Sequence, residues 1–279
     1  MSTENALLTI LTEKINNDTL VLPTLPAIAL KVRKAADDPE ANLNKMAEVI
    51  GQDPALTARI MKIANSAYLG RTVKVDSLQQ AVTRIGLRQI KNIATALAME
   101  QLFVSKNEIV RSYMDKLWTR TIDIAANAMA VFAFYKENPN KNKQLNTDSL
   151  TLAALIHNIG VLPILSEAER HEEVFANPTF LNVAIQKLAG RIGGAILREW
   201  GFSDDIVEVA EQWRNIKYQT DKHSYLDFVR LGAVLSGAIS GHKDTILNLT
   251  QQKGIVEDLT LLSSDEFIEI RDNAKAVFV

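Results

Sequence analysis

The chain has 279 residues, 47% of them hydrophobic and 23% charged, a mixture typical of globular proteins with room for a sizeable core. It has no cysteine, which excludes disulfides, thiolate catalysis and cysteine-ligated zinc. The net charge is −2, and no apolar run reaches the roughly 18 residues of a transmembrane helix. The N-terminus lacks the basic and apolar regions of a signal peptide. We therefore expect a soluble, cytoplasmic protein of one or two domains.

Apolar residues recur with the 3.6-residue period of helices, and no stretch shows the alternation of a β-strand. In the first part of the chain, helices are expected over 4–16, 27–36, 43–51, 53–67, 77–86 and 87–103. Two prolines favour an extended segment at Leu22–Pro26. Asp53 and Pro54 are suited to the cap and the first position of a helix, and Gly86 is expected to separate two successive helices.

The centre of the second part is Leu150–Leu165, which is almost wholly apolar and contains one ionisable group, His157. A helix that is hydrophobic all round lies inside a protein. Residues 146–148 offer N-caps, and Gly160 is expected to end the helix as its C′ residue, so that His157 and Asn158 lie in its last turn. The other expected elements are helices over 108–136, 181–200, 204–214, 224–240 and 264–277.

Charge is spread unevenly along the chain. Residues 1–106 carry a net charge of +3 and residues 107–279 a net charge of −5. Within 59–91, Asp76 is the only acidic residue among seven basic ones: Arg59, Lys62, Arg71, Lys74, Arg84, Arg88 and Lys91. We interpret this segment as a solvated basic face. The alternative is a docking surface for an acidic partner or for nucleic acid.

Together these patterns predict an all-α protein of roughly a dozen helices. The polar break at Lys106-Asn107 divides it into an N-terminal lobe, 1–106, and a second helical lobe, 107–279. His171, His223 and His242 lie in polar surroundings without ligand spacing and are expected on the surface.

Several motifs occur in a fixed order. They are Leu22–Pro26, Gln52–Arg59, Ile63–Ser66 and Ser77–Gly86, followed by Leu117-Trp118, Ala154–His157 and Leu197–Gly201. In this order and spacing the chain resembles the HDOD domain, a signalling relative of the HD-type metal phosphohydrolases. The resemblance covers about 22–240 and leaves a C-terminal helix beyond it. It implies one all-helical domain of two packed lobes, used as an output module in bacterial signal transduction.

The HD-type relatives bind metal ions with histidines and aspartates, and most of these positions differ here. Where the resemblance implies ligands, the chain has Thr119-Arg120-Thr121, His157-Asn158, Arg191, Gln212-Trp213-Arg214 and Gly232-Ala233. One imidazole and one amide are too few to hold a divalent cation, and nearby arginines would repel it. We therefore predict no metal, no cofactor and no catalytic residue. His157 is expected to be a hydrogen-bonded core residue, or alternatively part of a residual anion pocket with Asn158, Arg120 and Arg191.

The resemblance also implies an interaction surface, for which the candidates are Asp53, Asn65, Ser66, Arg84, Arg88 and Lys91. The predicted function is a non-catalytic output or scaffold domain that binds a protein partner. Two alternatives stay open: a metal-dependent phosphohydrolase acting on a nucleotide or cyclic dinucleotide, and a nucleic-acid-binding regulator using the 59–91 face. We expect no membrane partner, regard nucleic acid as the weaker choice, and leave formation of a homo-oligomer open.

Overall fold

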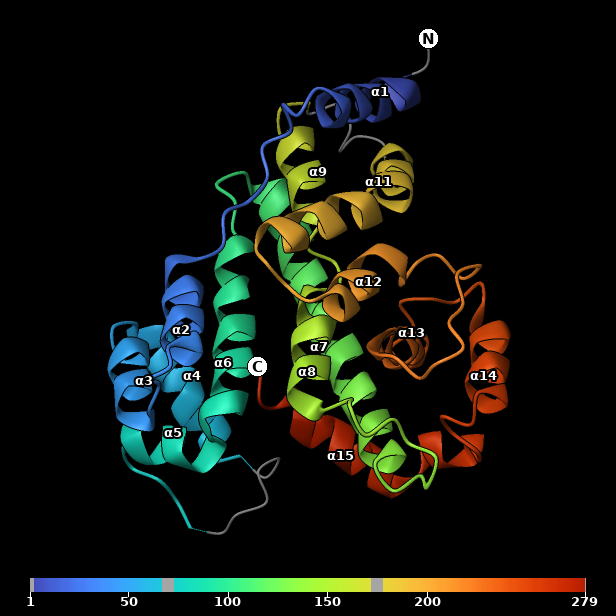
Figure 1. Cartoon of the computed structure of the whole chain (residues 1–279). Helices are drawn as coiled ribbons and strands as arrows, with labels where there is room; N and C mark the ends of the chain where they lie inside the picture. The colour runs from blue at the N-terminus through green and yellow to red at the C-terminus, as the bar shows by residue number, and fades with distance from the viewer. Residues whose placement is uncertain (1–2, 67–72, 172–177, 279) are drawn as a thin grey trace.

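The computed structural model describes residues 3–66, 73–171 and 178–278, and every regular element in these ranges is a helix (Figure 1). The first part contains α1 (Thr3–Asn16), α2 (Ala27–Asp37), α3 (Leu43–Ile50), α4 (Pro54–Ala64), α5 (Leu78–Ile85), α6 (Leu87–Ala98) and the short 3-10 helix η2 (Met99–Leu102). The second contains α7 (Glu108–Tyr135), α8 (Thr147–Ile156), α9 (Val161–Ala168), α11 (Pro178–Glu199), α12 (Asp204–Gln212), α13 (Tyr225–Leu235), α14 (Lys243–Gln252), η3 (Leu259–Ser263) and α15 (Asp265–Lys275). The all-α prediction is confirmed.

A single hydrophobic core runs through both parts of the chain. Helix α6 packs against α2 on one side and against α8 on the other, which joins the two parts. The long helix α7 contacts α8, α13 and α15 and forms the spine of the second part (Figure 1). The segment Thr147–Ala168 is long and apolar enough to span a membrane, yet 89% of its most apolar stretch is buried inside the protein. It is therefore a core segment, as predicted.

Helix α1 belongs in space with the second part of the chain. It packs against α9 and α11, at the top of Figure 1, and Lys14 Nζ lies 2.6 Å from the buried Glu167 carboxylate of α9. The boundary at Lys106-Asn107 coincides with the start of α7, where the Asn107 side chain accepts hydrogen bonds from Ile109 N and Val110 N.

Local capping explains where several helices begin. Asp53 accepts a hydrogen bond from Leu56 N at 2.9 Å, Ser77 accepts from Gln80 N, and Asn146 accepts from Ser149 N. Each bond satisfies one of the free amides of a first helical turn. Gly86 adopts φ +88° between α5 and α6, a conformation that favours glycine.

The expected role of Gly160 is wrong. Its φ is −67°, so it is not a left-handed C′ residue, and the chain turns at 157–160 and continues as α9. A Cβ at Gly160 would lie 2.0 Å from Ala189 O and 2.5 Å from Gly193 N, both on α11. The glycine is therefore needed because two backbones touch.

The predicted helix over 224–240 is also too long. Helix α13 ends at Leu235, and Gly237 follows with φ +75°. The next helix, α14, is absent from the sequence-based prediction. Only Ile246 and Thr250 of α14 are buried, so its sequence lacks a continuous apolar stripe.

Candidate functional site

His157 lies where α8 ends, almost completely buried at 1% exposure. Its Nδ1 is 2.5 Å from Ala154 O, and because a carbonyl can only accept, Nδ1 carries the proton. Burial, and to a lesser degree the charge of Arg214, lowers the pKa of His157 to about 3. The ring is therefore neutral at physiological pH, and Nε2 presents a lone pair that has no hydrogen-bond partner among the described protein groups.

Trp213 and Arg214 meet His157 from the end of α12. The Trp213 ring stands edge-on to the imidazole, with centroids 4.7 Å apart and planes at 85°. The Arg214 guanidinium lies over the indole, 4.0 Å from its centroid. Burial, with a smaller effect from Arg120, lowers the pKa of Arg214 to about 9, so this side chain still carries a positive charge at neutral pH.

A buried arginine of α13 holds the segment that carries Trp213 and Arg214. Arg230 is 5% exposed and donates to the carbonyls of Gln212, Asn215 and Tyr218 at 2.5–2.9 Å. Gln212 O belongs to the last turn of α12, where carbonyls lack helical partners. Because these carbonyls bracket Trp213 and Arg214, Arg230 fixes the turn that faces His157.

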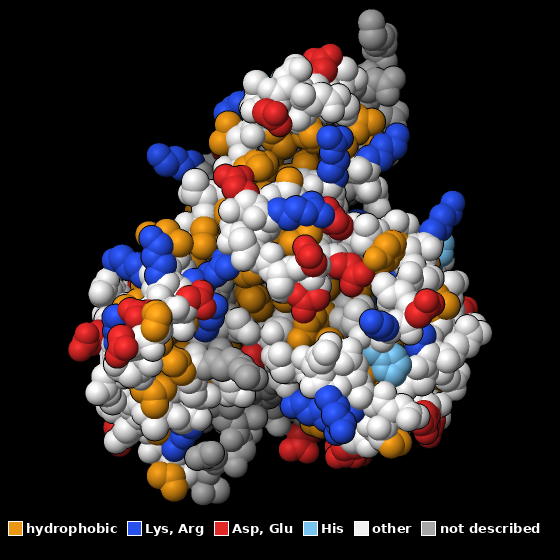
Figure 2. Space-filling model, viewed as in Figure 1, with side chains coloured by type: hydrophobic (Ala, Val, Ile, Leu, Met, Phe, Trp, Pro, Cys, Tyr) orange, Lys and Arg blue, Asp and Glu red, His pale blue; other side chains and the backbone are white. Residues whose placement is uncertain are grey.

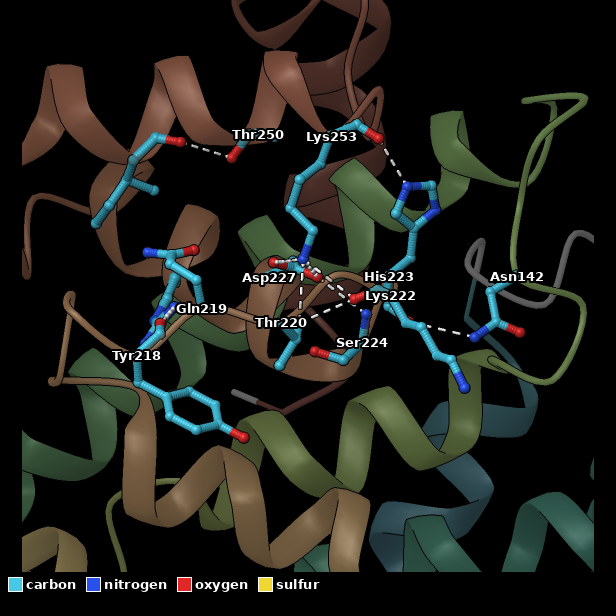
Figure 3. Close-up of polar contacts among 12 residues, drawn as sticks. Asn142, Tyr218, Gln219, Thr220, Lys222, His223, Ser224, Asp227, Thr250 and Lys253 are labelled. Carbon is cyan, nitrogen blue, oxygen red and sulfur yellow. Dashed lines mark hydrogen bonds and ion pairs between the residues drawn. The ribbon is translucent and has the colours of Figure 1, made fainter.

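The connection that follows, up to α13, is fixed by a second network, drawn in Figure 3. Lys253 Nζ lies 2.7 and 2.8 Å from the two oxygens of Asp227 and also donates to Thr220 Oγ1 and Lys222 O. His223 Nε2 donates to Lys253 O at 2.7 Å, and its Nδ1 is 2.6 Å from Tyr135 Oη. The expectation of a surface position for His223 is therefore wrong, because the side chain is half-buried in this network.

Among the described residues, no hydrogen bond or ion pair links the four residues of the predicted pocket to one another. Asn158 is buried beside His157 in sequence, and its Oδ1 has no protein partner in the described ranges. Arg120 is exposed on α7 and is an electrostatic neighbour of Arg214. Arg191 is exposed on α11, and no hydrogen bond or ion pair joins it to the other three described residues. The residues that complete the surroundings of His157 are Trp213 and Arg214, which sequence reasoning noted only as replacements for ligands.

These residues do not fit a divalent metal ion. The described residues contain no group of three or more histidine or acidic side chains able to hold one. Gly232 stands where the resemblance implies an aspartate ligand. A Cβ on Gly232 would lie 2.5 Å from Ile124 O, so the backbone of α7 leaves no room for a carboxylate side chain. The Arg214 guanidinium beside His157 would repel a cation.

Several residues of the predicted interaction surface form hydrogen bonds within the chain. Asn65 exchanges two hydrogen bonds with the backbone of Val75, and Ser66 donates to Ile63 O. Arg84 donates to Ala64 O at the end of α4 and to Val73 O in the connection that follows.

Asp53, in addition to capping α4, accepts from Gln101, and Lys91 pairs with Asp37 at 2.5 Å. The Arg88 side chain lies outside the described part of the structure. Asn65, Ser66 and Arg84 therefore come together around one loop, while Asp53 and Lys91 do not join them through any hydrogen bond or ion pair among described residues.

Three of the seven basic residues in 59–91 have charged or carbonyl partners within the described residues. Arg59 forms an ion pair with Glu100, Lys91 pairs with Asp37, and Arg84 is used by backbone carbonyls. Arg71 lies outside the described residues. On the face drawn in Figure 2, the Lys and Arg side chains over α2–α6 are interspersed with Asp and Glu. The segment thus contributes less free positive charge than its composition indicates.

Comparison with known proteins is consistent with the resemblance seen in the motifs. The family model of the HDOD domain matches residues 22–216. The chain belongs to the HDOD domain family. An uncharacterized protein of Treponema pallidum is 22% identical over 214 residues, 74% of this chain, and the match spans 40% of the length of that relative.

Solved structures show the same architecture over the whole chain. A protein of Shewanella amazonensis called "Putative metal-dependent phosphohydrolase" is 42% identical, with a TM-score of 0.93 and complete coverage of both chains. An HDOD domain protein of unknown function from Geobacter sulfurreducens is 19% identical, with a TM-score of 0.65 and 99% coverage of both chains. A "Putative signal transduction protein" of Marinobacter aquaeolei is 19% identical, with a TM-score of 0.66 over 98% of this chain and 65% of that one.

Proposed function

We propose that the chain is a non-catalytic output or scaffold domain that acts in cytoplasmic bacterial signalling by binding a protein partner. The main support for this proposal is that other residues stand at most positions where the resemblance implies metal ligands. One neutral imidazole faces an indole and a guanidinium, and Gly232, where the resemblance implies an aspartate, is packed against α7. Without a metal ion there is nothing at this site to activate water for phosphoester hydrolysis.

A metal-dependent phosphohydrolase acting on a nucleotide or cyclic dinucleotide is the second candidate. It is supported by the name of the 42% identical Shewanella protein and by the tautomer of His157. A histidine that donates from Nδ1 to a carbonyl offers Nε2 as metal-ligating histidines do. The nucleic-acid alternative is less supported, because Arg59, Arg84 and Lys91 have intramolecular partners.

Metal content and turnover separate the first two candidates. The protein is purified without chelator, incubated with manganese, iron or magnesium, and analysed for bound metal and for hydrolysis of a chromogenic phosphodiester and of cyclic dinucleotides. We expect metal far below one equivalent per chain and no turnover above that of His157→Ala. Stoichiometric metal with turnover that disappears in His157→Ala would contradict the proposal and establish the enzyme.

Partner binding is tested at Val73, in the connection between α4 and α5, where Arg84 donates to Val73 O. Val73 is 72% exposed, and Val21, elsewhere on the chain, is 74% exposed. Val73→Asp and Val21→Asp are therefore matched changes at two different places. We expect a partner captured from lysate, then purified and titrated, to lose affinity for Val73→Asp and to keep it for Val21→Asp. The opposite pattern would place the partner away from the predicted surface.

A further inference from the structure

Arg214 brings positive charge beside His157, and no acidic side chain among the described residues raises the pKa of this arginine. Arg214 is partly buried, its Nη1 is fully enclosed, and this atom has no acceptor among the described protein groups. The charged group that lowers the pKa of Arg214 is the guanidinium of Arg120, which repels it. Enclosing a guanidinium without a counter-charge is unfavourable, so this arrangement favours an anion that neutralises both arginines.

Several buried polar atoms without hydrogen-bond partners belong to residues at or beside the positions where the resemblance implies metal ligands. Buried polar groups in proteins normally have hydrogen-bond partners. Five described atoms around the old ligand positions lack one: Thr121 Oγ1, His157 Nε2, Asn158 Oδ1, Trp213 Nε1 and Arg214 Nη1. Four of the five residues are at most 5% exposed. They lie on α7, in the turn after α8 and at the end of α12, and α8 packs against both α7 and α12.

The chemical types of these atoms select the ligand. Arg214 Nη1 and Trp213 Nε1 are donors and require acceptor oxygens. His157 Nε2 is a lone pair and requires a donor, because Nδ1 already carries the proton. A singly protonated phosphate provides both, since it has several acceptor oxygens and one O–H group. Sulfate and carboxylates at neutral pH have no O–H and would leave His157 unsatisfied.

We propose that this site binds a phosphate-type oxyanion, held by Arg214 and the Trp213 N–H and donating its own O–H to His157 Nε2, with Arg120 at the solvent side. The degenerate metal site thus becomes a sensor site through which a phosphate compound adjusts the output domain. This inference relies on the proposed absence of a metal ion, so binding is measured in the presence of chelator.

Calorimetric titration of the full chain with inorganic phosphate, at constant ionic strength, tests the proposal. We expect one saturable site, binding about tenfold weaker or more in Arg214→Met, because a charge-assisted hydrogen bond is lost. Arg111→Met is the matched control, an exposed arginine on α7 like Arg120, and should bind as the wild type does. Sulfate should bind about tenfold more weakly than phosphate, since it leaves a buried acceptor unpaired.

If Arg214→Met does not fold, Trp213→Phe keeps an aromatic ring, removes the N–H donor and should weaken phosphate binding. Adenosine monophosphate provides the second arm. Tighter binding of this nucleotide than of free phosphate assigns the site to a nucleotide phosphoryl group, and the reverse assigns it to the free ion.

Absence of saturable phosphate binding, wild-type affinity in Arg214→Met or Trp213→Phe, or equal affinity for sulfate would overturn the proposal. Failure of phosphate binding in a protein that also lacks metal and turnover would contradict this inference alone. His157-dependent metal with turnover would contradict the proposed function itself.

Discussion

Adding one methyl group at Gly160 should strongly lower the free energy of unfolding. Its Cβ would lie 2.0 Å from Ala189 O, 2.5 Å from Gly193 N and 2.9 Å from Gly193 Cα. All three are backbone atoms of α11, so no side chain can rotate away and the two segments must separate by roughly 1 Å or more. Because His157 and Asn158 directly precede Gly160, this shift would also disturb the candidate site.

Overpacking of a close-packed core costs about 1–3 kcal/mol, and a clash with backbone on every side belongs at the upper end. Gly160→Ala should therefore lose about 3 kcal/mol of unfolding free energy, a large part of the roughly 5–15 kcal/mol that stabilises a domain. For a chain of this size the melting temperature should fall by about 6–9 °C. Differential scanning calorimetry and urea denaturation both measure the change.

The facing residue provides the control. A Cβ on Gly193 would meet Gly160 N at 3.4 Å and Ala210 Cβ at 3.5 Å, which is ordinary contact. Gly193→Ala should therefore be neutral or stabilise by up to about 1 kcal/mol through helix propensity. An unchanged melting temperature for Gly160→Ala, or equal damage from both changes, would refute the interpretation that the two backbones touch at Gly160.

Three further predictions concern the groups around the site. Arg230→Met should lower the free energy of unfolding by about 3 kcal/mol, because three carbonyls lose a charged donor. Urea denaturation measures the change, and wild-type stability would show that Arg230 does not hold the turn. His157 has a pKa of about 3 in the folded protein, below its unfolded value of 6.5, so the unfolded chain binds the proton first. The free energy of unfolding should therefore fall as pH is lowered from 6.5 towards 3, by about 1.4 kcal/mol per pH unit. Denaturation measured over this pH range should show a smaller slope in His157→Phe, and an identical slope would contradict the assignment. Asp227→Asn should cost about 3 kcal/mol, because the Lys253 ammonium loses its charge partner and keeps only its bonds to Thr220 and Lys222. The exposed pair of Asp38 should leave the melting temperature unchanged in Asp38→Asn. Equal effects of the two changes would count against a stabilising role of the Asp227–Lys253 pair.

Features that depend on neighbouring residues were predictable from the sequence. The N-caps Asp53, Ser77 and Asn146 each accept a hydrogen bond from the amide three residues further along, so their bonds form wherever the helix does. The burial of α8 followed from its being apolar on all sides. The motifs identified the family, which the family model over residues 22–216 supports. The lack of metal ligands stays a prediction from the resemblance, which implies histidines and aspartates at positions where this chain has other residues.

The resemblance pointed to Trp213 and Arg214 only as replacements for ligands, and their arrangement around His157 was decided by tertiary structure. Nothing in the sequence near His157 indicates that Trp213 and Arg214 face it or that Arg191 is exposed elsewhere, because these relations depend on how α8, α11 and α12 pack. Gly160 was expected to supply a left-handed turn and instead allows two backbones to touch, a contact that involves residues far along the chain. Local sequence sets the conformation of each segment, but which polar atom finds a partner, and which is left without one, is settled only when the helices meet.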